Sequence, residues 1–103
     1  MMTFLIMGKF TVQGIRNVKQ TTDRADRFRD IAANYGVKVK DIYWLSGEYD
    51  VVNIVEAEDE HSVSALLLDL GAWGNVTTTT FRAYTKEEMG LIITKMNEAK
   101  KQP

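Results

Sequence analysis

The sequence predicts an α+β domain in which four strands form an antiparallel sheet with helices on one face. Strand-like and helix-like segments follow in the order strand, helix, strand, strand, helix, strand, and a further helix comes last. A short turn containing glycine joins the two middle strands, which is a hairpin signal. Two right-handed βαβ crossovers then give the ferredoxin-like βαββαβ arrangement. The 103 residues contain no linker or low-complexity segment, so we expect a single domain over 1–103.

The first strand and the first helix are predicted from residue type and apolar spacing. Residues 3–10, TFLIMGKF, are aromatic and β-prone. From Thr22 onward, apolar residues recur at spacings of three and four, as on one face of a helix. We expect Thr22 or Asp23 to cap this helix, and Gly36 to end it because glycine tolerates a positive φ.

The middle of the chain predicts a β-hairpin. Residues 37–45 alternate as a strand until Lys40-Asp41, where the pattern slips and predicts a β-bulge. A tight turn at 46–50 then leads into an almost uninterrupted β run, 51–57. We expect Gly47 to take a positive φ that closes the turn.

Two further helices flank the last predicted strand. Asp59 is placed to cap the first helix, residues 75–84 predict the strand, and Thr85 with Glu88 forms a capping box for the last helix. The tail at 100–103 is predicted to fray. The apolar residues of the last helix fall on one face: Met89, Ile92, Ile93 and Met96.

Composition argues against several kinds of partner. The net charge is −1 and no basic stripe is present, so nucleic acid is not expected. Cysteine is absent and His61, the one histidine, follows acidic residues at a helix start, so we expect it to be solvated and predict no metal and no cofactor. No apolar run approaches the roughly 20 residues of a membrane span, and no signal peptide is recognisable. We therefore expect no membrane partner and a cytoplasmic location.

Both faces of the predicted sheet carry apolar side chains. Successive side chains of a strand point to opposite faces, yet two strands are apolar at adjacent positions: Phe4, Leu5, Ile6 and Met7, and Val51, Val52, Ile54 and Val55. One layer of helices covers only one face, so the other needs a second cover. We expect a second copy of the chain there, giving at least a homodimer. The alternative is that the last helix folds back over this face.

Five short segments spread along most of the chain form a recognisable set: Lys9-Phe10-Thr11-x-Gln13-Gly14, Arg24-Ala25, Val39-Lys40-Asp41-x-Tyr43-Trp44, Gly47-Glu48-Tyr49-Asp50-Val51-Val52, and Gly74-Asn75-Val76-x-Thr78-Thr79-Thr80. As a set they resemble the GYD-domain family of small, stand-alone proteins. The family label corresponds here to Gly47, Tyr49 and Asp50, with Glu48 between the first two. The resemblance implies a ferredoxin-like domain of the dimeric α/β-barrel type, without an established activity.

Two more distant likenesses suggest functions. The 46–57 hairpin is similar to that of the ligand-sensing domain of Lrp/AsnC-type regulators, a domain that oligomerises and binds amino acids near subunit interfaces. This chain lacks their helix-turn-helix. The fold alone resembles cofactor-independent monooxygenases of the dimeric α/β-barrel type. The leading hypothesis is a small oligomeric domain that binds a small organic or amino-acid-like ligand, in a sheet-face cavity or at a subunit interface. The alternatives are an oxygenase or isomerase of that type, and a purely structural or interaction module.

Six residues are candidate ligand contacts: Tyr43, Trp44, Tyr49, Asp50, Asn53 and Arg82. The Asp50 carboxylate is expected to accept N–H bonds from the turn behind it, with ligand binding or proton transfer as the alternative. Tyr49 is expected to pack across the hairpin, with its hydroxyl offered to a pocket as the alternative.

The other four candidates lie within strands. Tyr43 and Trp44 are adjacent, so one should join the helix-side core and the other should face the far side of the sheet. Asn53 and Arg82 are polar positions in otherwise apolar runs. If both face the far side, they form a polar cluster that suits a small organic acid or amide. The alternative is that both reach solvent at a strand end.

Overall fold

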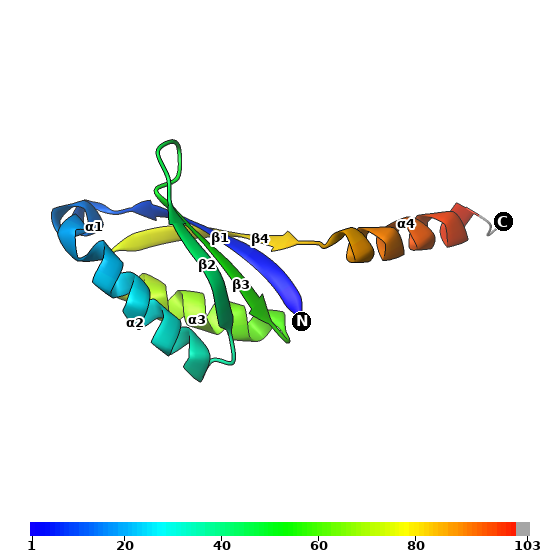
Figure 1. Cartoon of the computed structure of the whole chain (residues 1–103), viewed down its shortest axis with the longest axis horizontal. Coiled ribbons are helices and arrows are strands. Elements are labelled where there is room, and N and C mark those ends of the chain that lie inside the picture. The colour runs from blue at the N-terminus through cyan, green and yellow to red at the C-terminus, as the bar shows by residue number, and fades with distance from the viewer. Residues whose placement is uncertain (101–103) are drawn as a thin grey trace.

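The computed structural model describes residues 1–100 and confirms the α+β ferredoxin-like fold. One antiparallel sheet has the strand order β2-β3-β1-β4 (Figure 1). The prediction that the tail frays concerns residues that, beyond Lys100, lie outside the described range. The four strands are β1 (Met2–Phe10), β2 (Lys38–Trp44), β3 (Val51–Ala57) and β4 (Val76–Ala83).

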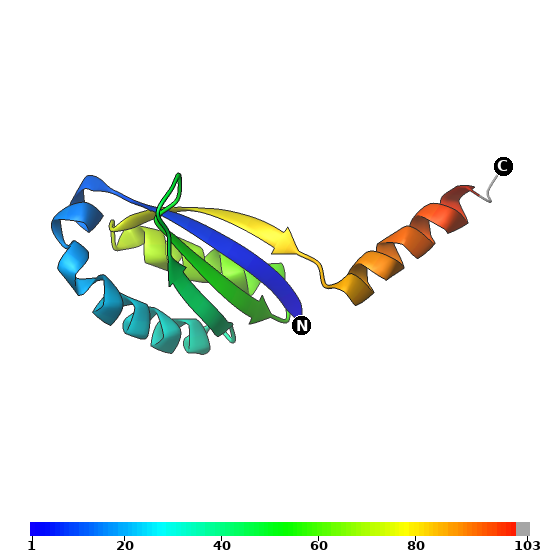
Figure 2. The same ribbon diagram turned by 45° about the horizontal axis from the view of Figure 1, so that its top comes forward.

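Helices α2 (Thr21–Asn34) and α3 (Glu60–Ala72) lie together on one face of the sheet, and the core lies between them and the sheet (Figure 2). Its fully buried side chains include Ile6, Val55 and Leu66. The helices of the described chain are α1 (Val12–Arg16), α2 (Thr21–Asn34), α3 (Glu60–Ala72) and α4 (Lys86–Lys100), and a 3-10 turn, η1 (Val18–Gln20), precedes α2.

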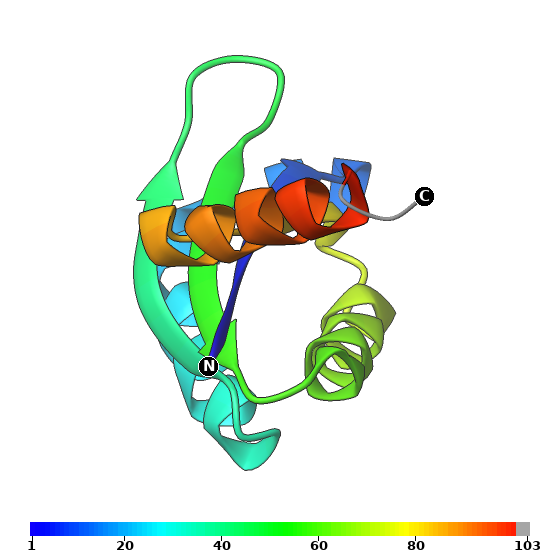
Figure 3. The ribbon, with the colours of Figure 1, turned by 90° about the vertical axis from the view of Figure 1, so that its right-hand side faces the viewer.

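The last helix, α4, extends away from the rest of the protein beyond β4 (Figures 1 and 2), and it is nearest the viewer in Figure 3. The molecule is accordingly elongated, with extents of 59 × 30 × 20 Å. The alternative in which this helix folds back over its own sheet is therefore not what the structure shows. The face of the sheet opposite α2 and α3, here called the open face, has no helix over it within residues 1–100.

Most of the predicted helix ends are confirmed. Asp59 accepts the Ser62 N–H at 2.8 Å, and this bond lowers the pKa of its carboxyl. In the capping box, the Glu88 N–H donates to Thr85 Oγ1 and the Thr85 N–H donates to Glu88 Oε1, both at 3.1 Å. Gly36 ends α2 with a φ of 71°.

The predicted cap of α2 is wrong. The helix begins at Thr21 with Gln20 in the cap position, and no side chain bonds to the free N–H groups there. The reason is that η1 leads directly into α2, so the residues before the helix already have a helical-type turn. No extended residue then precedes the first turn, as a side-chain cap requires.

The predicted β-bulge is confirmed between Val39 and Asp41. Val39 pairs with Val55, but the next helix-side pair is Ile42 with Asn53. The extra residue reverses which positions of β2 face the helices from that point on. This reversal decides where the aromatic pair at the end of β2 points.

Candidate functional site

The strand register divides the candidate residues between two faces. The buried side chains of β3 and β1 mark the face toward the helices, and residues paired with them share that face. Trp44 pairs with buried Val51, so it faces the helices, while Tyr43 faces away. The prediction that the two aromatics lie on opposite faces is confirmed. Trp44 lies at the rim rather than in the core, since it is 43% exposed.

Asn53 and Arg82 do not form the predicted far-side cluster. Asn53 is only 8% exposed on the helix side of β3. Arg82 pairs with buried Phe4 and so lies on the helix side of β4. Both residues therefore lie on the helix side of the sheet instead of the far side. Neither is exposed to solvent at a strand end, which was the alternative.

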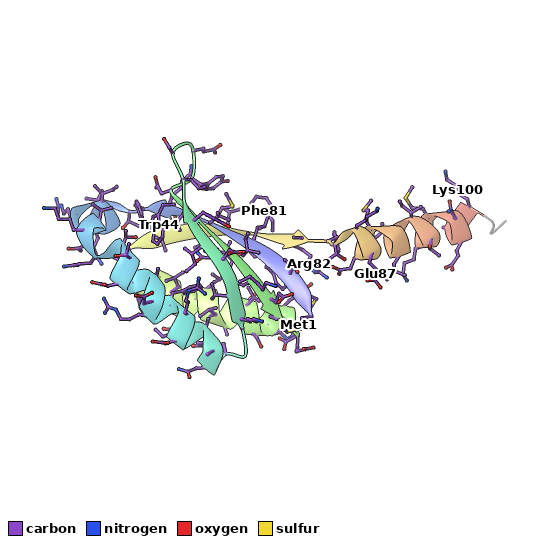
Figure 4. The ribbon with its side chains drawn as sticks, in the orientation of Figure 1. Met1, Trp44, Phe81, Arg82, Glu87 and Lys100 are labelled. Atoms are coloured by element: carbon purple, nitrogen blue, oxygen red, sulfur yellow. The ribbon has the colours of Figure 1, made fainter. Side chains whose placement is uncertain are left out.

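Arg82 is held where β4 leads into α4 (Figure 4). Its Nη2 donates to Glu88 at 2.7 Å, and its Nη1 donates to the carbonyls of Thr3 and Ala83. The guanidinium also lies over the ring of Tyr84, with a separation of 4.7 Å. Glu88 has a lowered pKa, first because it accepts the Thr85 N–H and then because of Arg82. Arg82 therefore connects the sheet to the start of α4.

The Asp50 carboxylate, at the end of the hairpin turn, bonds to the neighbouring strand β1. It accepts the Phe10 N–H at 2.8 Å, forty positions away in sequence. The Asp50 N–H also donates to the Gly8 carbonyl, and its own carbonyl accepts the Leu45 N–H. The expectation that this carboxylate accepts N–H bonds from the turn behind it is wrong, because the donor that it bonds belongs to β1, just past the last β1–β3 pair, Gly8 and Val51.

The rest of the hairpin turn lies at the surface. Gly47 does not take the positive φ that was expected, since among described residues only Gly36 and Gly74 do. Lys9 lies over the Tyr49 ring at 5.3 Å and within 3.8 Å of Glu48. Packing against Lys9 is the contact that the structure gives to Tyr49. Its role as a ligand contact remains a prediction, as does that of the other five candidates.

Two of the motif segments meet at a tight junction beside the hairpin. Thr11 donates its hydroxyl to the Gly74 carbonyl at 2.6 Å and accepts the Gly14 N–H at 3.0 Å. The Gln13 amide bridges the Trp73 carbonyl and Asn75 Oδ1. A Cβ on Gly14 would lie 2.0 Å from the Asn75 carbonyl oxygen, so no larger residue fits there without movement. These motif residues fix the path of the chain.

A pocket opens on the helix side between α2, the end of the sheet and Trp73. Trp44 Nε1 donates to Thr21 Oγ1 at 3.0 Å across its rim. Asn53 and Arg24 both line it. Sequence reasoning did not single out Arg24 as a candidate. The available signal was its place in the Arg24-Ala25 segment of the family set.

Among residues 1–100, the other titratable side chains lie outside this pocket. His61 is exposed, as predicted. Tyr35 donates to Asp69 at 3.0 Å and joins α2 to α3, and this bond raises the tyrosine pKa. Among residues 1–100, no three or more acidic, histidine or cysteine side chains gather closely enough to hold a metal ion. In the same range, none of the helices has both the length and the apolar character needed to span a bilayer.

The fold and the hairpin define the class as a small ferredoxin-like α+β domain with one open sheet face. Within this class the chain belongs to the GYD domain family, whose model matches residues 4–93. The "Glutamine synthetase and cystathionine beta-lyase binding protein" of Thermus thermophilus is 33% identical over 84 residues, which are 81% of this chain and 88% of that protein.

Solved structures share the fold at low sequence identity. The crystal structure of MtbAldR superposes with a TM-score of 0.65 at 19% identity, over 82% of this chain. The chain spans 52% of that longer protein. TTHA0845 from Thermus thermophilus has a TM-score of 0.55 at 18% identity, covering 82% of this chain and 95% of that one. FFRP-DM1 has a TM-score of 0.54 at 21% identity, covering 82% and 100%.

Proposed function

We propose that this protein is a small binding domain that acts as a homodimer, formed through the open faces of two sheets, and that the dimer binds other proteins. One observation carries the proposal: each of the four strands places at least one apolar side chain on the open face, and α4 extends away from that face. The side chains concerned are half-buried or exposed: Leu5, Met7, Tyr43, Val52, Ile54 and Phe81.

The size of the open face supports a role for α4 in the same assembly. Four strands of about seven residues measure roughly 20 by 23 Å from the usual strand spacing and rise. This flat outline is about 460 Å², which leaves little margin for the ~800 Å² of accessible surface that each partner buries in a standard interface. Exposed apolar side chains on α4, including Met89, Ile93 and Met96, offer the additional area. A lone helix of about 15 residues is marginal in water, so packing on a partner subunit would stabilise it.

The proposal of protein partners draws on the Thermus relative, which is named for binding glutamine synthetase and cystathionine beta-lyase. By that likeness, glutamine synthetase is the first partner to test. Binding of the purified enzyme to immobilised wild-type protein is expected. Its absence at micromolar concentrations would remove this partner without touching the dimer proposal.

Light scattering during gel filtration tests the dimer. The wild-type protein is expected to show at least twice the chain mass of 11.7 kDa. Phe81→Glu places a charge on the open face and should give a monomer. Leu68→Glu makes the same change on α3, at a side chain 78% exposed, and should not. A wild-type mass of one chain that persists on concentrating the sample would refute the proposal.

A small-molecule-binding role is the second candidate, and the helix-side pocket favours it. The oxygenase or isomerase alternative gains no such support. The strand candidates do not line one cavity: Tyr43 lies on the open face, Trp44 and Asn53 line the helix-side pocket, and Arg82 is held beside α4.

A further inference from the structure

The helix-side pocket combines an apolar lining with a single charged group. Its cavity volume is about 60 Å³. One water needs about 10–15 Å³ on the same measure, so the space suits a group of about four to six heavy atoms. Phe28, Ile42 and Trp44 contribute apolar surface, and Arg24 is the one charged residue that residues 1–100 place in the lining. Within that range no carboxylate borders the cavity to neutralise the guanidinium.

Two polar side chains at this pocket have hydrogen-bonding groups that can face an occupant, Asn53 and Arg24. Asn53 is more than nine-tenths buried, and it lines the pocket. Arg24 donates from Nη1 to the Asn17 carbonyl at 2.7 Å, while its Nη2 is buried without a partner. Buried polar groups are rarely left unpaired, because they lose their water without compensation. Both side chains therefore have hydrogen-bonding capacity to offer an occupant.

We propose that this pocket binds a small monocarboxylate with a short apolar chain. The carboxylate accepts hydrogen bonds from the Arg24 guanidinium and the Asn53 amide, and the apolar chain lies against Phe28 and Trp44. Charge-assisted bonds of this kind are the strong ones in a site that excludes water. Thr21 adds a third donor, because its oxygen accepts from Trp44 while its hydroxyl proton stays available.

The same lining disfavours an α-amino acid. An ammonium group beside the carboxylate would need acidic or carbonyl partners, and it would lie close to the positive Arg24. Among the described residues the lining offers no acidic side chain. The ligand class is therefore a simple or 2-oxo carboxylic acid. This inference is independent of the proposed dimer, because the pocket lies on the opposite side of the sheet from the open face.

Tryptophan fluorescence provides a direct readout. The chain has two tryptophans, Trp44 and Trp73, and both line the pocket. Titration of the wild-type protein with propionate should change the emission to saturation and shift the Trp44 indole N–H resonance. Propionamide, which has the same shape without the charge, and alanine, which adds the ammonium, should each bind about tenfold more weakly or worse.

Matched variants locate the charge. Arg24→Gln removes the guanidinium and should weaken propionate binding by about tenfold or more. Arg27→Gln makes the same change one turn along α2, outside this pocket, and should leave binding within about twofold of wild type. Thermal melts establish that each variant is folded. If the Arg24 variant does not fold, the comparison of propionate with propionamide on the wild-type protein decides alone.

Three results would overturn the proposal. The first is no spectral change with propionate at tens of millimolar, a range that covers weak binding. The second is equal binding of propionamide or alanine. The third is an equal loss in the Arg24 and Arg27 variants, which would assign the effect to net charge instead of to a contact in the pocket.

Discussion

The Asp50→Ala substitution tests whether the family aspartate is a structural residue. In the wild-type protein its carboxylate accepts the Phe10 N–H at 2.8 Å and so joins the hairpin to β1. The alanine variant keeps the backbone bonds from Asp50 to Gly8 and from Leu45 to Asp50. What it removes is the bond made by the side chain, and it leaves the Phe10 N–H without its acceptor.

The magnitude follows from the charge and the exposure of this bond. A hydrogen bond to a charged group contributes about 1.5–3 kcal/mol when buried. Asp50 and Phe10 are both half-buried, so water can partly replace the carboxylate. We therefore expect a loss of about 1–2 kcal/mol in the free energy of unfolding. For a chain of this size, that corresponds to a Tm lower by about 4–16 °C.

Urea unfolding followed by circular dichroism measures this loss at one fixed protein concentration, because self-association shifts apparent stability. Asp50→Asn keeps an acceptor without the charge and should lose about half as much. Glu48→Ala removes an exposed carboxylate from the same turn, 3.8 Å from Lys9, and should change stability by less than about 0.5 kcal/mol. Hydrogen exchange at Phe10 should accelerate in the Asp50→Ala variant alone.

Two results would contradict a structural role for Asp50. If Asp50→Ala unfolds at the wild-type urea concentration, the carboxylate does not stabilise the hairpin. If the same variant also fails to bind propionate or a protein partner, the aspartate belongs to a binding site. Its contact with Phe10 would then be incidental.

Two further predictions concern the junction at Gly14 and the start of α4. Gly14→Ala places a Cβ 2.0 Å from the Asn75 carbonyl oxygen and should cost about 2–4 kcal/mol in urea unfolding. Gly71→Ala meets nothing within 4 Å in α3 and should stabilise by about 0.5–1 kcal/mol; equal effects would contradict the close approach. Glu88 has a pKa below its ordinary 4.5, so its stabilising effect is present above that value and is lost as pH falls through the folded pKa. The stability difference between wild type and Glu88→Gln should therefore shrink below about pH 4.5, and a difference that stays constant down to about pH 3 would contradict this account.

Local signals in the sequence were sufficient for the order of elements and for most of their ends. The Asp59 cap and the Thr85–Glu88 box each act within three residues, so their geometry follows from neighbours in the chain. The break at Lys40-Asp41 showed as a slip in a period of two. The prediction of the α2 cap failed because no comparable local sequence pattern marks η1, which precedes that helix.

Only the tertiary structure decided which face each strand side chain occupies. Alternation groups Val51, Asn53 and Val55 on one side, but both sides of β3 are apolar, so the sequence does not say which one the helices cover. The partner of Asp50 lies forty positions away, and Arg24 and Asn53 line the same pocket from different elements. Such contacts depend on the packing of whole elements, which short-range periodicity does not encode. The sequence by itself therefore determined the fold and the family, whereas the pocket and the open face exist only once the helices have packed on one side of the sheet.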